Sequence, residues 1–191
     1  QEPRRVATAT TMSARHLLAI GVKEYGPDDL RVASLHFGLG QVLHHKESDY
    51  AAAEVEFRKA LEIQENWSGT ESVVVASTLH ELAVVLVAKG EVTAAEPLYW
   101  RALSIREKRS GAEHPDVALV LYGLARLLAA KGDHTAAVPL YRRLIAIREK
   151  QYGLEHQHVI ALKRLLAGQE EAVRLEEAVR LIGARERDGR E

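Results

Sequence analysis

The stretch Ser110–Gly132 reads SGAEHPDVALVLYGLARLLAAKG, and its pattern returns elsewhere in the chain. Gly69, Gly111 and Gly153 are spaced by 42 residues, and Gly26 lies 43 residues before Gly69. Between the two middle copies the matching pairs are Leu79/Leu121, Leu82/Leu124, Ala83/Ala125, Gly90/Gly132, Ala95/Ala137, Pro97/Pro139, Tyr99/Tyr141 and Ile105/Ile147. Self-similarity at one fixed period of this length indicates a repeat architecture.

Each copy predicts a helical hairpin, because apolar residues recur at spacings of three and four in two stretches with a glycine or polar break between them. First helices are expected over 30–46, 72–89, 115–131 and 158–168, and second helices over 49–66, 91–109 and 133–151. In HPDVA, His114 precedes Pro115 and Asp116, which is a helix start signal. The prediction is an all-α fold, a right-handed α-solenoid of stacked antiparallel helical hairpins.

The repeat also predicts how the chain is divided. Residues 1–26 are expected to form an N-terminal tail and a half-repeat, with a helix over about 12–25. Residues 27–152 form three repeats of 42 or 43 residues, and residues 153–191 a partial fourth repeat and a C-terminal capping helix. The extra residue of the first repeat falls in HKESD, where a lengthened turn is expected. The opening half-unit suggests a piece of a longer solenoid.

The C-terminal segment departs from the repeat after Ile160. Its apolar residues keep helical spacing: Leu165, Gly168, Ala172, Leu175, Val179 and Ile182. The favoured interpretation is a helix that caps the last repeat, with a kink or tight turn at Gly168-Gln169. The alternative is a long helix that pairs with its copy in another chain.

Composition excludes some classes of partner. The 26 basic residues are scattered among 27 acidic ones, for a net charge of -1, which argues against nucleic acid. No apolar run approaches the roughly 20 residues that span a bilayer. The sequence has no cysteine, which excludes disulfides and thiolate metal sites and fits a cytoplasmic protein.

The repeat resembles a known family. The pattern of Leu121, Leu124, Ala125, Leu128, Gly132, Ala137 and Tyr141 resembles the tetratricopeptide repeat. The 42-residue period, with AEPLYWRALSIREK and GAEHPDVA, resembles its kinesin light chain-type variant over nearly all of residues 12–168. The resemblance implies a binding scaffold. Small residues such as Ala83 and Ala125 are expected where two helices approach closely, with Phe57, Tyr99 and Tyr141 filling the space to the next unit.

One feature of the resembled family is missing. There, a pair of asparagines within LNNLA typically holds the backbone of a bound peptide. The corresponding pairs here are Phe37-Gly38, His80-Glu81 and Tyr122-Gly123. The motor-adaptor role of the kinesin light chains is therefore not carried over to this chain.

The first helices carry the predicted binding residues, since stacked hairpins present those helices on a concave face. The predicted peptide-binding residues are Phe37, Gln41, His44, His80, Val84, Tyr122, Arg126 and Arg164. An aromatic ring beside arginine suits an acidic peptide with an apolar anchor. Phe37 and Tyr122 have an alternative role in packing under a neighbouring helix, which is favoured for Phe37, whereas binding is favoured for Tyr122.

The nine histidines raise the possibility of a metal site or a catalytic site. Adjacent residues of an α-helix point about 100° apart, so His44 and His45 are not expected to hold one ion together. The HExxH pattern fails because Val84 stands where its second histidine belongs. His114 and His156 are expected to cap helices or form turns. No phosphate loop or nucleophile motif is present, and we expect no enzyme activity, no metal and no cofactor.

Two functions follow from these observations. The leading one is a non-catalytic protein-protein interaction scaffold that binds a peptide or helix in the concave groove. The alternative is a self-associating structural solenoid that forms homo-oligomers through its terminal helices. An enzyme fragment with its catalytic domain elsewhere ranks third.

Overall fold

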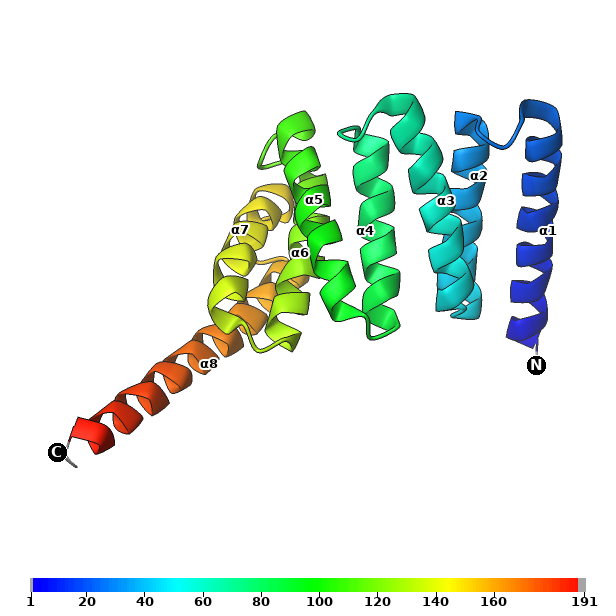
Figure 1. The fold of residues 1–191 in the computed structure, drawn as a ribbon. Coiled ribbons are helices and arrows are strands. Elements are labelled where there is room, and N and C mark those ends of the chain that lie inside the picture. The colour runs from blue at the N-terminus through cyan, green and yellow to red at the C-terminus, as the bar shows by residue number, and fades with distance from the viewer. Residues whose placement is uncertain (1, 189–191) are drawn as a thin grey trace. The chain divides into compact units, whose positions relative to one another are not determined.

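The computed structural model describes residues 2–188, and for residues 2–9, 47 and 182–188 it describes the backbone alone. All regular structure in this range is helical, as the all-α solenoid prediction requires. The helices are α1 (Glu2–Tyr25), α2 (Leu30–Val42), α3 (Tyr50–Ser68), α4 (Val73–Ala88), α5 (Val92–Ser110), α6 (Pro115–Ala130), α7 (His134–Tyr152) and α8 (Gln157–Asp188), with a π-helical turn η1 (Leu43–Glu47) after α2 (Figure 1).

The chain divides into two compact units, 1–111 and 112–191. In the first unit, α2 pairs with α3 and α4 with α5, α3 packs on α4, and α1 packs on α2 as the predicted half-repeat. In the second unit, α6 pairs with α7, and α7 packs on α8. Each pair is one of the predicted hairpins.

Short side chains define where the helices begin. Asp29, Ser72 and Asp133 each accept a hydrogen bond from a backbone N–H of the first turn. The predicted start of α6 is confirmed, because Nδ1 of His114 accepts from the Asp116 N–H at 3.2 Å. His156 makes the same contact with the His158 N–H at 3.2 Å, which confirms the capping role of both histidines.

The core confirms the predicted packing residues. Ala83 and Ala125 are fully buried, and Phe57 is fully buried as well. Gly40 occupies the repeat position of Ala83 and Ala125. A Cβ atom on Gly40 would lie 2.8 Å from the Phe57 ring, so the close approach of this ring requires glycine in the first hairpin.

The extra residue of the first repeat is accommodated inside a helix, so the prediction of a lengthened turn is wrong. The α-helix ends at Val42, and the chain continues as the π-helical turn η1 up to Glu47. Ser48 then adopts a left-handed φ of 54°, the role that Gly90 has in the second repeat with φ 84°. A π-turn closes a ring that is one residue larger than an α-turn, and it therefore absorbs one inserted residue without lengthening the loop.

The terminal helices are longer than predicted. Helix α1 begins at Glu2 instead of near residue 12, and α8 runs from Gln157 to Asp188 without a break. A tight turn at Gly168-Gln169, one of the two predicted options, is wrong because the helix continues through both residues. One glycine costs an interior helical position only about 1 kcal/mol relative to alanine, and the alanine, glutamate, arginine and leucine residues around it favour the helix.

The apolar stripe of α8 covers the last repeat only in part. Val159 and Leu162 are buried, and α8 packs on α7. Leu175 and Val179 are 58% and 70% exposed. The C-terminal part of α8 extends beyond α7 (Figure 1). The capping role of this helix stays a prediction, and the side chain of Ile182 lies outside the described residues.

Candidate binding surfaces

Phe37 lies on the surface formed by α2 and α4 and has two roles. The edge of its ring meets Phe57 at a centroid distance of 5.6 Å, which is the predicted packing contact. It also lines an open cavity of about 280 Å³. The cavity residues are Ser34, Phe37, Gln64, Val74, Ser77 and Thr78. Phe37 thus offers an apolar wall to a side chain from outside.

The floor of this cavity was not predicted from the sequence. Gln64 of α3 is buried and its Oε1 accepts a hydrogen bond from the Thr78 hydroxyl at 2.7 Å. Gln64, Arg106 and Arg148 occupy the same repeat position, and all three are buried polar residues. A polar residue repeated every 42 positions within an apolar stripe is the sequence signal that could have revealed this buried polar position.

Gln41 and His44 lie further along the same surface, next to η1. Gln41 lies beside Glu81 of α4, and burial raises the pKa of this carboxyl against the opposing effects of His45 and Gln41. The His44 and His45 rings stack at 4.3 Å with 29° between their planes. The expectation that these two rings diverge is wrong, since their side chains bring the rings together on the π-turn.

His80 and Val84 of α4 are half-buried. The His80 ring meets Tyr99 edge-on at 5.6 Å. Burial, helped by the charge of Arg106, lowers the pKa of His80 to about 4, so the ring is neutral at pH 7. His80 therefore contributes to packing and offers a partner no positive charge.

The second unit presents an aromatic ring beside an arginine. The Arg126 guanidinium carbon lies 5.4 Å from the centroid of the half-buried Tyr122 ring, a cation–π contact within helix α6. Arg126 is exposed, as is Arg164 on α8. Neither arginine forms an ion pair with any residue that the structure describes. Burial raises the pKa of Tyr141, a shift to which Tyr122 adds and which Arg126 opposes.

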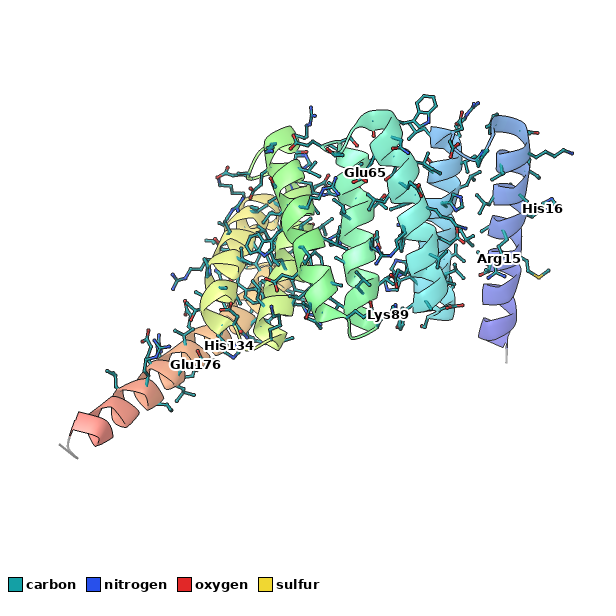
Figure 2. The ribbon with its side chains drawn as sticks, in the orientation of Figure 1. Arg15, His16, Glu65, Lys89, His134 and Glu176 are labelled. Atoms are coloured by element: carbon teal, nitrogen blue, oxygen red, sulfur yellow. The ribbon has the colours of Figure 1, made fainter. Side chains whose placement is uncertain are left out.

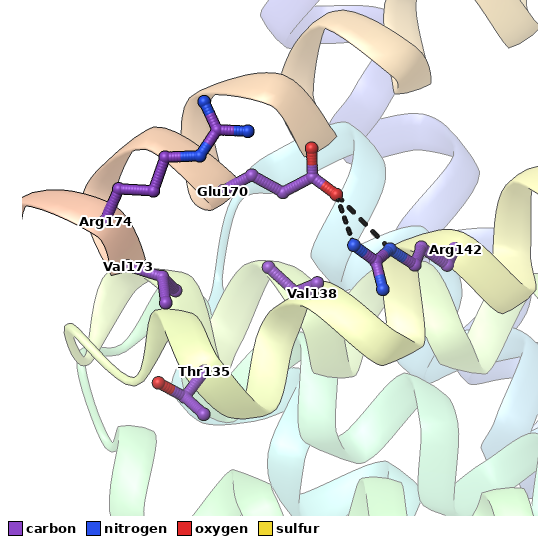
Figure 3. Close-up of a pocket in the computed structure, with 6 residues that line it drawn as sticks. All are labelled: Thr135, Val138, Arg142, Glu170, Val173 and Arg174. Carbon is purple, nitrogen blue, oxygen red and sulfur yellow. Dashed lines mark hydrogen bonds and ion pairs between the residues drawn. The ribbon is translucent and has the colours of Figure 1, made fainter. Parts of the chain in front are cut away.

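A further cavity of about 400 Å³ lies between α7 and α8, and the sequence did not predict it. Thr135, Val138, Arg142, Glu170, Val173 and Arg174 line it (Figure 3). Arg142 donates two hydrogen bonds to Oε1 of Glu170, at 3.2 and 2.7 Å. His134 and Glu176 lie next to each other (Figure 2), with 3.9 Å between Nε2 of His134 and Oε1 of Glu176. Polar contacts therefore join α8 to α7 along this wall.

Two family models match the chain, both of the tetratricopeptide repeat. One matches residues 33–66 and the other residues 74–150, together more than half of the sequence. The chain belongs to the tetratricopeptide-repeat family. No curated protein sequence matches it significantly.

Solved structures share the tetratricopeptide-repeat fold. Two are crystal structures of nearly identical TPR-like repeats of a putative kinesin light chain from Podosopora anserina, one of them a point-substituted form. The substituted form has a TM-score of 0.72 and 23% identity, covering 98% of this chain and 95% of that one. The other has a TM-score of 0.71 and 24% identity over 96% and 94% of the two chains. BtubC (BKLC) from P. vanneervenii has a TM-score of 0.67 and 20% identity, covering 90% of this chain and 72% of that one.

Tetratricopeptide repeats in general mediate protein–protein interactions, and the fold is typically a non-catalytic scaffold. Within residues 2–188, no helix has the length and apolar character needed to cross a membrane.

Proposed function

We propose that this tetratricopeptide-repeat protein is a non-catalytic scaffold that binds a peptide or helix of a partner on its first helices, which are α2 and α4 in the first unit and α6 and α8 in the second. The pairing of Tyr122 with Arg126 is the observation that carries the proposal. The contact holds an exposed guanidinium in place over an aromatic ring, and no described carboxylate neutralises it. A pre-positioned cation beside an apolar ring suits a partner carboxylate next to an apolar side chain.

The first unit supplies an apolar site of the same kind. The cavity at Phe37 is large enough for one side chain, and both apolar side chains and hydroxyl groups line it. Arg164 stands on α8 at the repeat position that Tyr122 has on α6. We therefore expect the second unit to bind an acidic peptide with an apolar side chain, mainly through its arginines.

The test is binding to an array of acidic–aliphatic and acidic–aromatic peptides. Arg126→Glu should weaken the best binders at least about tenfold, because it replaces attraction by repulsion at the contact. Tyr122→Ala should weaken them less. Binding should also fall as added salt screens the charges.

Lys150→Glu on α7 is the matched control, since it changes the charge by the same amount on a second helix. Its ion pair with Glu113 joins two exposed side chains and is worth little. Arg142 is unsuitable because it joins α7 to α8. Loss of binding in Lys150→Glu, with Tyr122→Ala and Arg126→Glu unaffected, would show that the second-helix face is the binding surface.

Self-association is a second candidate function, and exposed residues of α8 favour it. Leu175 and Val179, four residues apart on one face of the helix, are 58% and 70% exposed. Stripes of this kind pair helices of separate chains. Light scattering should then show a mass that rises with concentration, and Leu175→Lys with Val179→Lys should give a monomer at every concentration. A wild-type chain that is monomeric at high concentration would exclude this function.

A further inference from the structure

Three side chains from two neighbouring repeats meet beside η1. They are His44 and His45 of η1 and Glu81 of α4. One potential ligand atom from each lies within 4.8 Å of the other two. Among the residues that the structure describes, no other group of three histidine, aspartate or glutamate side chains meets this condition.

The repeat itself does not require these residues. At the positions of His44 and His45, the second repeat has Val87 and Ala88, and the third has two alanines. At the position of Glu81, the first and third repeats have glycine. The solenoid therefore forms with small or apolar residues at all three positions, and the polar cluster belongs only to the junction of the first two repeats.

The local backbone and the hydrogen bonds favour a shared ligand. The two imidazoles stack side by side on the π-turn, and π-turns are frequent at functional sites. Nδ1 of His44 is buried and has no hydrogen-bond partner in the described part of the chain, which is an unfavourable state for a polar atom. Gln41 lies beside the Glu81 carboxylate, as polar outer residues do at metal sites.

We propose that His44, His45 and Glu81 bind one divalent transition-metal ion, with zinc as the representative. Two imidazoles and one carboxylate suit Zn²⁺, Ni²⁺ or Cu²⁺, whereas Mg²⁺ and Ca²⁺ prefer oxygen ligands alone. Ligand atoms of tetrahedral zinc lie about 3.4 Å apart, so these three, now within 4.8 Å of one another, must draw together by up to about 1.4 Å, which side-chain rotation provides. Water completes the coordination. This site goes beyond the proposed peptide-binding function and does not depend on it.

Calorimetric titration of the full chain, freed of metal with a chelator, tests the site. We expect one equivalent of Zn²⁺ to bind with a dissociation constant of about 10 μM or below, and Mg²⁺ to give no binding heat. His44→Val with His45→Ala, which installs the residues of the second repeat, should weaken zinc binding at least about hundredfold. Glu81→Gln should weaken it at least about tenfold.

His156→Ala with His158→Ala is the matched control, because it removes the other closely spaced pair of histidines, which is exposed. Zinc affinity should be unchanged in this variant. Thermal melting followed by circular dichroism checks that each variant is folded. If the variant with His44→Val and His45→Ala does not fold, the zinc affinity of Glu81→Gln decides whether the site exists. Absence of zinc binding to the wild-type chain up to about 100 μM overturns the proposal, as does equal affinity in a folded η1 variant or in Glu81→Gln.

Discussion

Replacing Phe57 by alanine should lower the free energy of unfolding by roughly 3–5 kcal/mol. The ring is fully buried, meets Phe37 edge-on and packs against Gly40, where no Cβ separates it from the backbone of α2. Truncation removes the buried apolar surface and leaves a cavity that the surrounding helices fill only in part. Urea denaturation followed by circular dichroism measures the loss.

Trp100→Ala is the control for this prediction. Trp100 is a larger aromatic residue on a second helix, but it is 43% exposed. Its truncation should therefore cost clearly less than that of Phe57, even though more atoms are removed. An equal cost for the two variants would mean that Phe57 does not fill the first hairpin as the structure shows.

The period of the sequence predicted most of the fold. Leu79 and Leu121 match across 42 residues because both face the interior of a hairpin, and helical spacing then assigns every helix between residues 30 and 152. The repeat pattern was easy to detect because the same packing requirement selects similar residues in each successive copy. The start of α6 followed from His114 and Pro115 alone, since capping depends on local chemistry.

The errors occur where hydrogen bonding, not hydrophobic spacing, decides the structure. The alignment located one extra residue near His45, but a loop and a π-turn absorb an insertion equally well, and spacing does not distinguish them. Gly168 disfavours a helix by only a small free energy, which the prediction overestimated. The long run of helix-forming residues around it keeps α8 continuous.

The binding surfaces were predictable only where they lie on one helix. Tyr122 and Arg126 are four residues apart, so their contact follows from helical geometry. His80 has the same repeat position as Tyr122, yet its ring packs against Tyr99 of the next helix. The cavity between α7 and α8 likewise depends on which side chains of two separate helices meet, and that depends on tertiary packing.

Replacing Ala125 by leucine should lower the free energy of unfolding by roughly 1–3 kcal/mol. Ala125 is fully buried in α6, the helix that pairs with α7. A small residue recurs at its position in the first two repeats, as Gly40 and Ala83. Leucine is nearly as good a helix former as alanine, so the loss reports on steric overlap and not on helix propensity.

Ala130→Leu provides the same change of side chain on the same helix at an exposed position. Its free energy of unfolding should stay within about 0.5 kcal/mol of the wild-type value. Both variants are compared by urea denaturation under identical conditions. If Ala125→Leu is as stable as Ala130→Leu, then α6 and α7 are not in close contact at Ala125, and the recurrence of small residues at this position needs a different explanation.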